Sequence, residues 1–592
     1  MSGAKTLLNT LKTVLKSRGH PFPIPVMGYV GGAILPVSDA MHGDKDIKFY
    51  PSKTEAGGSH AAEGFAKATG HLGIMMSTSG PGVLNTVTSM QNARSDGTPL
   101  LVLAGQVSTK VLGTDAFQEA PVLEITKPIT KLSIMIKNSN TIETSLEDVI
   151  DTAFNRRHGP VLLDLPKNIM SLPAEPRDCC GSGCGSCLND KGPNKLKEID
   201  QTINAAQIID LIGKSTRPVI LAGQGVIQAK AVHLLRIFSR VYNIPVTTTL
   251  MGLGVMNERN PLSLKMVGMH GSYSANMAVQ RSDLLLNFGS RFDDRIIGDP
   301  TQFAKNATIV HVDIEKHNIN KVIKTPHYIN GDCKDVLHKL IEQRQTAEAI
   351  QPEKQNWLNL LQDWKSKQPF LLPENKKALQ GRKVIAVLNT LIYNPLNKRS
   401  RFTIIADVGA HQMWAAQFID YDYNKVRFIT SGGLGTMGFA LPASIGVKIG
   451  LPKHKVICIV GDGGFTMSYV ELLTAIENKI NIKVFVINNS YQLMVKMWQD
   501  KFYDNRHIGV KMNNPPFEKV CEAMGCKALR IDSKANIEHK IQSVLDYEYG
   551  PIVVNFITDD SEPVLPMVSP GKAIDDMILE DVNDKLSGDA PC

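Results

Sequence analysis

The chain has 592 residues, 43% of them hydrophobic, and its 65 Lys and Arg against 57 Asp and Glu give a formal net charge of +8. At about 150 residues per domain this length predicts three or four domains, and the ordinary composition excludes collagen-like, coiled-coil and mostly disordered chains. No run of about 18 apolar residues occurs and the positive charges form no block, so we expect neither a membrane span nor a nucleic-acid arm, and small anionic ligands suit the charge better.

The first residues, 1–16, are basic and amphipathic. They have two interpretations, a mitochondrial presequence or the first helix of a domain, and we favour the helix because a strand-and-turn segment follows closely. Since no secretory hydrophobic region is present, we expect a cytoplasmic location, with organellar import left open.

Short β-branched strands, each followed by a Gly-rich turn and a helical stretch, recur along the chain. This pattern predicts an α/β fold of three doubly wound parallel-sheet domains. We place them at residues 1–170, 203–345 and 379–592. The stretches 171–202 and 346–378 read as linkers. In such sheets ligands bind at the carboxyl ends of the strands.

In the first domain, Thr54-Glu55 follows a strand and opens a helix, where a Glu can point into a crevice. His60 and Glu63, farther along that helix, are interpreted as packing or anchoring residues.

Nine cysteines are present. Four of them lie in residues 179–187, namely Cys179, Cys180, Cys184 and Cys187. These four could bind one zinc ion or iron–sulfur unit. The alternative, a linker that binds nothing, is favoured because two separated ligand pairs are missing. The other five are dispersed, as is typical of free thiols in a cytosolic enzyme.

In the middle domain, a short Gly223-x-Gly225 after a strand is weak evidence for a dinucleotide. The set Gly289-x-Arg291-x-Asp293-x-Arg295 is stronger, because two guanidinium groups can clamp a diphosphate.

In the third domain, Gly461-Asp462-Gly463 ends one strand and Asn488-Asn489 ends the next. A carboxylate and a carboxamide at one sheet edge suit Mg²⁺, and the glycines let a diphosphate approach the backbone. This pairing resembles the signature of thiamine diphosphate (ThDP) enzymes. The resemblance implies that Asp462, Asn489 and the main-chain carbonyl of Tyr491 hold Mg²⁺.

The same resemblance assigns the remaining contacts of ThDP. It implies that Met437 is the wedge that bends the cofactor, although Met437 could also be an ordinary core residue. It implies that Glu55 hydrogen-bonds the pyrimidine ring as the catalytic carboxyl, a task that needs shielding from water so that its pKa rises. The implied contacts of the diphosphate and aminopyrimidine are Gly409, Ala410, His411, Gly435, Met437, Gly461 and Gly463.

Ordered motifs over nearly the whole chain, from residue 5 to Met567, resemble the catalytic subunit of acetolactate synthases. They include Gly28–Pro36, Gly113–Glu119 and Met494–Gln499. The resemblance implies decarboxylation of pyruvate and ligation to a second 2-oxo acid, such as pyruvate or 2-oxobutyrate, at the first common step of branched-chain amino-acid biosynthesis. It implies a homodimer or tetramer with sites between subunits, and leaves open a separate regulatory subunit. Residues implied at the reaction centre are Gly32, Phe117, Gln118 and Trp498.

For the middle domain the resemblance implies a structural FAD. Its implied contacts are Gly223, Gly225, Thr249, Leu250, Met269, His270, Gly289, Arg291, Asp293, Arg295, Asp313, Ile314, Asp332 and Cys333.

Four residues depart from the family's pattern. Thr54 replaces His, Val30 replaces Pro, Ala410 replaces Gln and Leu493 replaces Gly. Leu493 matters most, since a bulky side chain there could alter the backbone or crowd the pocket. Two alternatives therefore stay open: another ThDP-dependent 2-oxo acid decarboxylase or oxidase, and a catalytically weak cofactor-binding paralogue.

Overall fold

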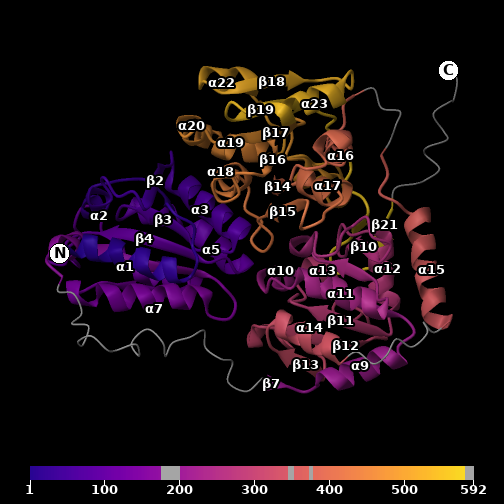
Figure 1. The fold of residues 1–592 in the computed structure, drawn as a ribbon. Coiled ribbons are helices and arrows are strands. Elements are labelled where there is room, and N and C mark those ends of the chain that lie inside the picture. Colours follow the sequence, from indigo (N-terminus) through magenta and orange to yellow (C-terminus); the bar gives the residue numbers. More distant parts are fainter. Residues whose placement is uncertain (175–199, 344–351, 373–377, 580–592) are drawn as a thin grey trace.

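The computed structural model describes residues 1–174, 200–343, 352–372 and 378–579. Three sheets of mainly parallel strands, coloured from indigo through magenta to yellow in Figure 1, each carry helices and form three domains. Each sheet has a hydrophobic cluster on both faces, as parallel sheets require. The predicted α/β class is confirmed. Residues 179–187, with the four clustered cysteines, lie outside the described residues.

The N-terminal sheet has six parallel strands in the order β2-β1-β3-β4-β6-β5. Its strands are β1 (Ile24–Gly28), β2 (Ile47–Pro51), β3 (Gly73–Ser77), β4 (Leu100–Gln106), β5 (Leu132–Met135) and β6 (Pro160–Pro166). Its helices are α1 (Gly3–Ser17), α2 (Leu35–Ala40), α3 (Glu55–Thr69), α4 (Pro81–Leu84), α5 (Val87–Asp96), α6 (Val122–Thr126), α7 (Ile142–Phe154) and α8 (Lys167–Ser171).

The first helix, α1, belongs to this domain. Leu7, Leu8, Leu11 and Leu15 recur on one face of the helix and are buried in the core. The amphipathic pattern is therefore that of a packed domain helix. Within the described residues, none of the helices has the length and apolar character needed to cross a membrane.

The C-terminal sheet repeats the topology of the N-terminal one, with the order β15-β14-β16-β17-β19-β18. Its strands are β14 (Phe402–Ala406), β15 (Val426–Thr430), β16 (Lys455–Gly461), β17 (Ile482–Asn488), β18 (Lys527–Ile531) and β19 (Ile552–Ile557). Its helices are α16 (Gly381–Ile392), α17 (Ala410–Phe418), α18 (Ala440–Gly450), α19 (Asp462–Ser468), α20 (Leu472–Glu477), α21 (Leu493–Phe502), α22 (Phe517–Ala523) and α23 (Ile537–Asp546). A small antiparallel pair, β20 (Met567–Val568) and β21 (Met577–Ile578), follows.

The middle sheet has the order β10-β9-β8-β11-β12-β13, with a short antiparallel β7 beside β13. Its strands are β7 (Asp200–Gln201), β8 (Pro218–Ala222), β9 (Val246–Thr248), β10 (Ser263–Met266), β11 (Leu284–Phe288), β12 (Thr308–Asp313) and β13 (His327–Asn330). Its helices are α9 (Ala205–Lys214), α10 (Gln224–Gln228), α11 (Val232–Tyr242), α12 (Tyr273–Arg281), α13 (Asp294–Ile297) and α14 (Cys333–Glu342). Counted from β8, this is the strand order of dinucleotide-binding sheets, whose switch point lies between β8 and β11.

The stretch expected to be the second linker contains a long helix, α15 (Pro352–Lys367). Trp357 and Leu361 on this helix are buried in the middle domain's core. The segment therefore packs as part of that domain over these residues.

The N- and C-terminal domains contact each other through α3 and α18, which lie side by side in Figure 1. Glycines let the two backbones touch. A Cβ added at Gly446 would lie 1.7 Å from the carbonyl oxygen of Ala61, and one at Gly64 would lie 2.2 Å from that of Ala443. Neither distance leaves room for a side chain, so this crossing fixes how the two domains sit together.

We expect Gly446→Ala to lower the free energy of unfolding by about 1–3 kcal/mol, because overpacking forces the helix backbones apart. Denaturant unfolding of the purified protein measures this. Gly213→Ala is the control, since Gly213 lies in the exposed part of α9 with no atom within 4 Å of its Cβ position. There the added methyl should stabilise the helix by about 0.5–1 kcal/mol. Equal effects of the two substitutions would contradict the close crossing.

Candidate functional site

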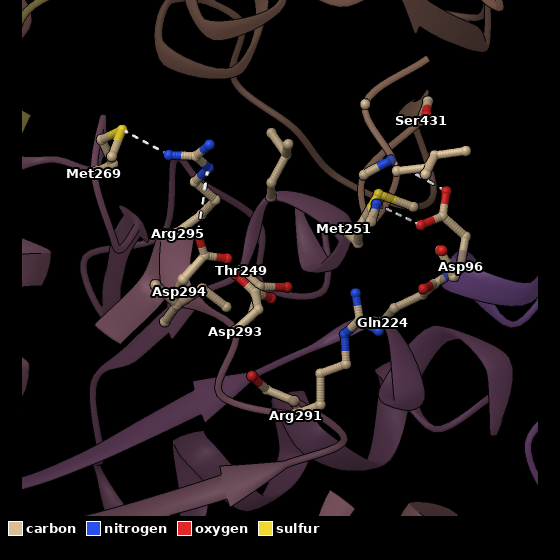
Figure 2. A pocket seen from close by; sticks show the side chains of 18 of the residues that line it. Asp96, Gln224, Thr249, Met251, Met269, Arg291, Asp293, Asp294, Arg295 and Ser431 are labelled. Carbon is tan, nitrogen blue, oxygen red and sulfur yellow. Dashed lines mark hydrogen bonds and ion pairs between the residues drawn. The ribbon is translucent and has the colours of Figure 1, made fainter. Parts of the chain in front are cut away.

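A cavity of about 1130 Å³ runs between the carboxyl edges of the middle and C-terminal sheets, and the N-terminal domain closes one wall (Figure 2). From the middle domain its lining includes Gly225, Thr249, Leu250, Met269, His270, Gly289, Arg291, Asp293, Arg295, Asp313, Ile314, Asp332 and Cys333. From the C-terminal domain it includes Gly409, Gly435, Met437 and Trp498. Residues predicted to contact two different cofactors thus line one continuous space.

Three glycines bring two turns of the middle domain into contact beside the cavity. A Cβ at Gly223 would lie 2.2 Å from the carbonyl oxygen of Gly289, and one at Gly225 would lie 2.7 Å from its Cα. Gly289 itself has a φ of +64°. The turns after β8 and β11 therefore touch at the switch point, and Gly223 serves this contact without lining the cavity. The buried Ser290 hydroxyl lacks a hydrogen-bond partner among the described residues, which leaves a polar group for a ligand.

Arg291 and Arg295 face different parts of the cavity in Figure 2. The Arg295 guanidinium lies beside Met269, with Nη1 3.7 Å from Sδ, and Arg295 Nε is 3.8 Å from the Asp294 carboxylate. Arg291 instead approaches the C-terminal domain, since a Cβ at Gly433 would lie 2.8 Å from its Nη2. The joint clamp of one diphosphate by both arginines stays a prediction.

Several wall residues from the N-terminal domain were missed by sequence reasoning: Ser95, Asp96, Arg156, Arg157 and His158. Arg157 donates to the carbonyl oxygens of Arg94 (2.8 Å) and Ser95 (2.6 Å). Arg156 donates to Oδ1 of Asn330 in the middle domain (3.3 Å). The two consecutive arginines before β6 are visible in the sequence as a possible anion-binding pair. Only the tertiary structure shows that their turn contacts the middle domain.

At the C-terminal end, Gly409 (φ +146°) and Gly435 (φ +72°) adopt backbone conformations that favour glycine. Ala410 and His411 begin α17. The ring Nε2 of His411 accepts the N–H of Gly461 (3.2 Å), and burial lowers the pKa of His411 to about 3, so the ring is neutral. His411 therefore supports the turn after β16.

Asp407, which sequence reasoning also missed, fastens the start of α18. Its carboxylate accepts the main-chain N–H groups of Val408, Gly438 and Ala440 at 2.8–3.0 Å. Burial raises its pKa to about 6. Asp407 thus ties the segment after Met437 to the end of β14.

The predicted metal ligands lie at the ends of neighbouring strands. Asp462 follows β16 and Asn489 follows β17, and these strands pair in parallel. Oδ2 of Asp462 accepts the amide of Asn514 (2.6 Å), while Oδ1 of Asn489 accepts the N–H of Tyr491 (3.0 Å). Burial raises the pKa of Asp462 to about 6. A buried carboxylate, a carboxamide and a turn carbonyl form an oxygen-rich set that fits Mg²⁺.

Glu55, Gly32, Phe117 and Gln118 do not line this cavity. Glu55 begins α3 and its Oε2 accepts the amide of Asn85 (3.0 Å). The Phe117 side chain is 87% exposed, and no atom lies within 4 Å of a Cβ at Gly32. One chain therefore presents the predicted centre as two halves that do not share a cavity.

The residue before Glu55 is held by the C-terminal domain. The buried Glu471 carboxylate accepts the N–H groups of Lys53 and Thr54 and the Thr54 hydroxyl (2.9–3.2 Å). The same hydroxyl accepts the N–H of Gly57 and caps α3. Thr54 thus fits its place, although the family pattern has His there.

The other departures also fit. Leu493 is the first residue of α21, and its side chain is buried in the C-terminal core and does not line the cavity. Ala410 is buried at the start of α17, and Val30 is exposed. None of these three side chains lines the cavity.

Comparisons with known proteins match all three domains. Family models for thiamine pyrophosphate enzymes match residues 24–125 (N-terminal TPP binding domain), 205–340 (central domain) and 407–556 (C-terminal TPP binding domain). The chain is 39% identical over 570 residues to "Acetolactate synthase, mitochondrial" of Schizosaccharomyces pombe, covering 94% of this chain and 84% of the relative. It is 38% identical to "Acetolactate synthase catalytic subunit, mitochondrial" of Saccharomyces cerevisiae, covering 93% and 81%. It is 36% identical to "Acetolactate synthase large subunit" of Lactococcus lactis, covering 98% and 96%.

We expect Glu471→Gln to lower the free energy of unfolding by about 1–3 kcal/mol, because an amide NH₂ then faces donors that need an acceptor. Glu477→Gln is the matched control. It lies on the same segment, and its carboxylate only pairs with the Lys53 ammonium (2.7 Å) at the surface. That control should change stability by less than about 1 kcal/mol. Chemical denaturation of both variants measures the two losses of unfolding free energy. Equal losses would show that the buried Glu471 contacts stabilise the fold no more than the surface ion pair of Glu477 does.

Proposed function

The chain belongs to the acetolactate synthase family of thiamine diphosphate enzymes, and we propose that it decarboxylates pyruvate and joins the two-carbon unit to a second 2-oxo acid. With pyruvate or 2-oxobutyrate as acceptor the product is 2-acetolactate or 2-aceto-2-hydroxybutyrate, the first common step of branched-chain amino-acid biosynthesis. The observation that carries this proposal is the cavity, which joins a dinucleotide-type switch point to the turns that carry Gly409, Gly435 and Met437 at the carboxyl edge of the C-terminal sheet.

Bound thiamine diphosphate supplies a thiazolium ring that accepts the electrons released when a 2-oxo acid loses carbon dioxide. In our proposal Asp462, Asn489 and the Tyr491 carbonyl hold Mg²⁺, which neutralises the diphosphate. Gly409 and Gly435 leave the backbone open to the cofactor, and Met437 lies against its bend.

Glu55 holds a proton at the aminopyrimidine ring in this proposal, and Gly32, Phe117 and Gln118 lie near the reacting atoms. Because one chain keeps Glu55 outside the cavity of Met437, a second copy must bring its own N-terminal half to that cavity. The exposed Phe117 and the open space at Gly32 support such a partner. We therefore propose a homodimer as the smallest active form, with a tetramer built from it.

Helix α21 contributes three apolar side chains to the cavity wall, those of Met494, Val495 and Trp498. An apolar wall keeps water from the reacting carbon, so that transfer to a second 2-oxo acid prevails over protonation. Trp498, which packs edge-on against Phe502, narrows the place proposed for the acceptor.

We propose FAD as the ligand of the middle-domain part of the cavity, in a structural role. The strand order of the sheet, the glycine contact between β8 and β11 and the unpartnered Ser290 hydroxyl support this proposal.

The relatives' names "catalytic subunit" and "large subunit" support a separate regulatory subunit, which we propose as a partner. We further propose a cytoplasmic location, because α1 is a packed helix of the domain. The fungal relatives are named as mitochondrial proteins. Determining where the native protein is located in the cell distinguishes a cytoplasmic location from import into an organelle.

With pyruvate, Mg²⁺, ThDP and FAD, we expect the protein to form 2-acetolactate. Glu55→Gln should reduce this rate about 10²- to 10⁴-fold while ThDP still binds, because a neutral amide cannot hold the ring proton. Product analysis measures the rate, and protein fluorescence follows ThDP. Glu124→Gln, exposed on α6, is the control and should keep full activity. Equal rates for wild type and Glu55→Gln would refute the role of Glu55, and acetaldehyde or acetyl phosphate as the main product would indicate another ThDP reaction.

Quenching of flavin fluorescence tests the FAD proposal. We expect Arg295→Gln to weaken FAD binding about tenfold, since a charged hydrogen bond to a phosphate is lost. Among the described residues, the Arg295 side chain makes the two weak contacts given above, so the fold should survive the substitution. Arg281→Gln, exposed on α12, should bind FAD as wild type does. Absence of flavin quenching in the wild type would reject FAD altogether.

A further inference from the structure

We propose that Asp96 is a positioning residue for the cofactor loop, residues 431–437, of its own chain, so that each N-terminal domain serves two thiamine sites. It serves its own chain's site through Asp96 and the partner's site through Glu55. The inference rests on the proposed function, which supplies the cofactor and the pairing of two chains.

Asp96 is the last residue of α5 in the N-terminal domain and is only 2% exposed. Its Oδ1 accepts the N–H of Gly433 (2.7 Å), and its Oδ2 accepts the N–H of Gly432 (3.1 Å). Figure 2 shows the Asp96 carboxylate pointing toward the loop segment that carries Ser431. One carboxylate therefore fixes two successive peptide groups of another domain, and charged acceptors make the stronger hydrogen bonds.

Lys67, near the end of α3, holds Asp96 in place. Its ammonium donates to Oδ2 of Asp96 (2.6 Å) and to the carbonyl oxygen of Thr430 (2.8 Å) and pairs with Glu63 (3.1 Å). Burial by itself would lower the pKa of Lys67, but the charges of Asp96 and Glu63 raise it above its ordinary value. Lys67 therefore stays charged although its side chain is 4% exposed, and it touches both the clamp and the start of the loop.

A second, uncharged contact joins the same two domains. The Ser431 hydroxyl donates to Oδ1 of Asn92 (2.6 Å) and accepts the N–H of Thr436 (2.8 Å). The Asn92 amide in turn donates to Glu63 (2.7 Å). The first residues of the loop thus hydrogen-bond to α5 of the N-terminal domain, and α3 holds the residue just before them.

The far end of the loop is held by Asp407 of the C-terminal domain, through Gly438 and Ala440. Between the two anchors lies Gly435, whose Cβ position has only Val408 Cγ1 near it, at 4.0 Å. Gly435, which is proposed to meet the aminopyrimidine, therefore has little protein packed against it, and its position depends on the two anchors. Helix α3 carries Glu55 at its first turn and Lys67 at its last, so one rigid element reaches both sites.

Titration with ThDP in saturating Mg²⁺ tests the clamp. We expect Asp96→Asn to raise the half-saturating ThDP concentration about 10- to 100-fold, while kcat at saturating ThDP stays within about twofold. The reason is that the loop loses its correct conformation in the free protein and regains it when ThDP binds. Ser431→Ala, which changes no charge, should act in the same direction more weakly and serves if Asp96→Asn does not fold.

Asp44→Asn is the matched control. Asp44 lies in the same domain, and its carboxylate likewise accepts a lysine ammonium (Lys12, 2.7 Å) and a main-chain N–H (Asp46, 2.9 Å). It should leave the ThDP titration unchanged. Unchanged half-saturation in Asp96→Asn and Ser431→Ala, or a loss of kcat alone, overturns the inference. A wild type that does not bind ThDP overturns the proposed function instead.

A subunit-exchange experiment tests the claim of two sites. Homodimers of Asp96→Asn and Glu55→Gln are mixed, exchanged and assayed at a ThDP concentration that leaves Asp96→Asn unsaturated. In a hybrid dimer, one site combines an intact loop clamp with the partner's intact Glu55. Random exchange should therefore restore about one quarter of the wild-type rate, because about half of the dimers are hybrids with one intact site each. If Asp96 acted on the partner's loop, each hybrid site would carry one defect and activity would not return.

Discussion

The contact between the backbones of α3 and α18 is the constraint on which the arrangement of the outer domains depends. At Gly64 and Gly446 main chain meets main chain, so the two helices have a single way to lie together. This crossing brings α5 to the cofactor loop and the Glu471 carboxylate to the segment before Glu55. Contacts made by polar side chains elsewhere in the interface are possible because the glycines have already set the distance.

Three buried carboxylates fix the segments near the site once the crossing of α3 and α18 has set the domain arrangement. Asp96, Asp407 and Glu471 are each nearly inaccessible, and each accepts at least two main-chain N–H groups from a segment near the site. Burying an ionised carboxyl is unfavourable unless such donors surround it, so each group holds its segment in one position. The buried carboxylates therefore order the loops of the site from the interior of the protein. The face of each loop that borders the cavity remains free to contact a ligand.

The two outer sheets share one strand order, yet the same edge is used differently in each. In the C-terminal domain the turns after β14 and β16 carry Asp407, Gly409 and Asp462. In the N-terminal domain the turn after β1 leaves open space beside Gly32, and Glu55 opens the helix after β2. Two domains of the same topology thus differ in function: the C-terminal domain can bind a cofactor, and the N-terminal domain can act on it. The middle domain adds a separate sheet edge of the type that binds dinucleotides.

The sequence by itself determined the fold class and the sheet edges, because β-branched strands followed by glycine turns are a local pattern. It also predicted Asp462 and Asn489 as neighbours, since consecutive parallel strands place their carboxyl ends together. It did not indicate Asp96, Asp407, Glu471 or Arg157, which resemble ordinary surface charges when taken one at a time. Only the tertiary structure decided their places, because each acts on a segment distant along the chain, from 31 residues for Asp407 and Gly438 to 418 for Glu471 and Lys53. Such pairings depend on how helices cross and on which donors are buried, and no local pattern encodes either.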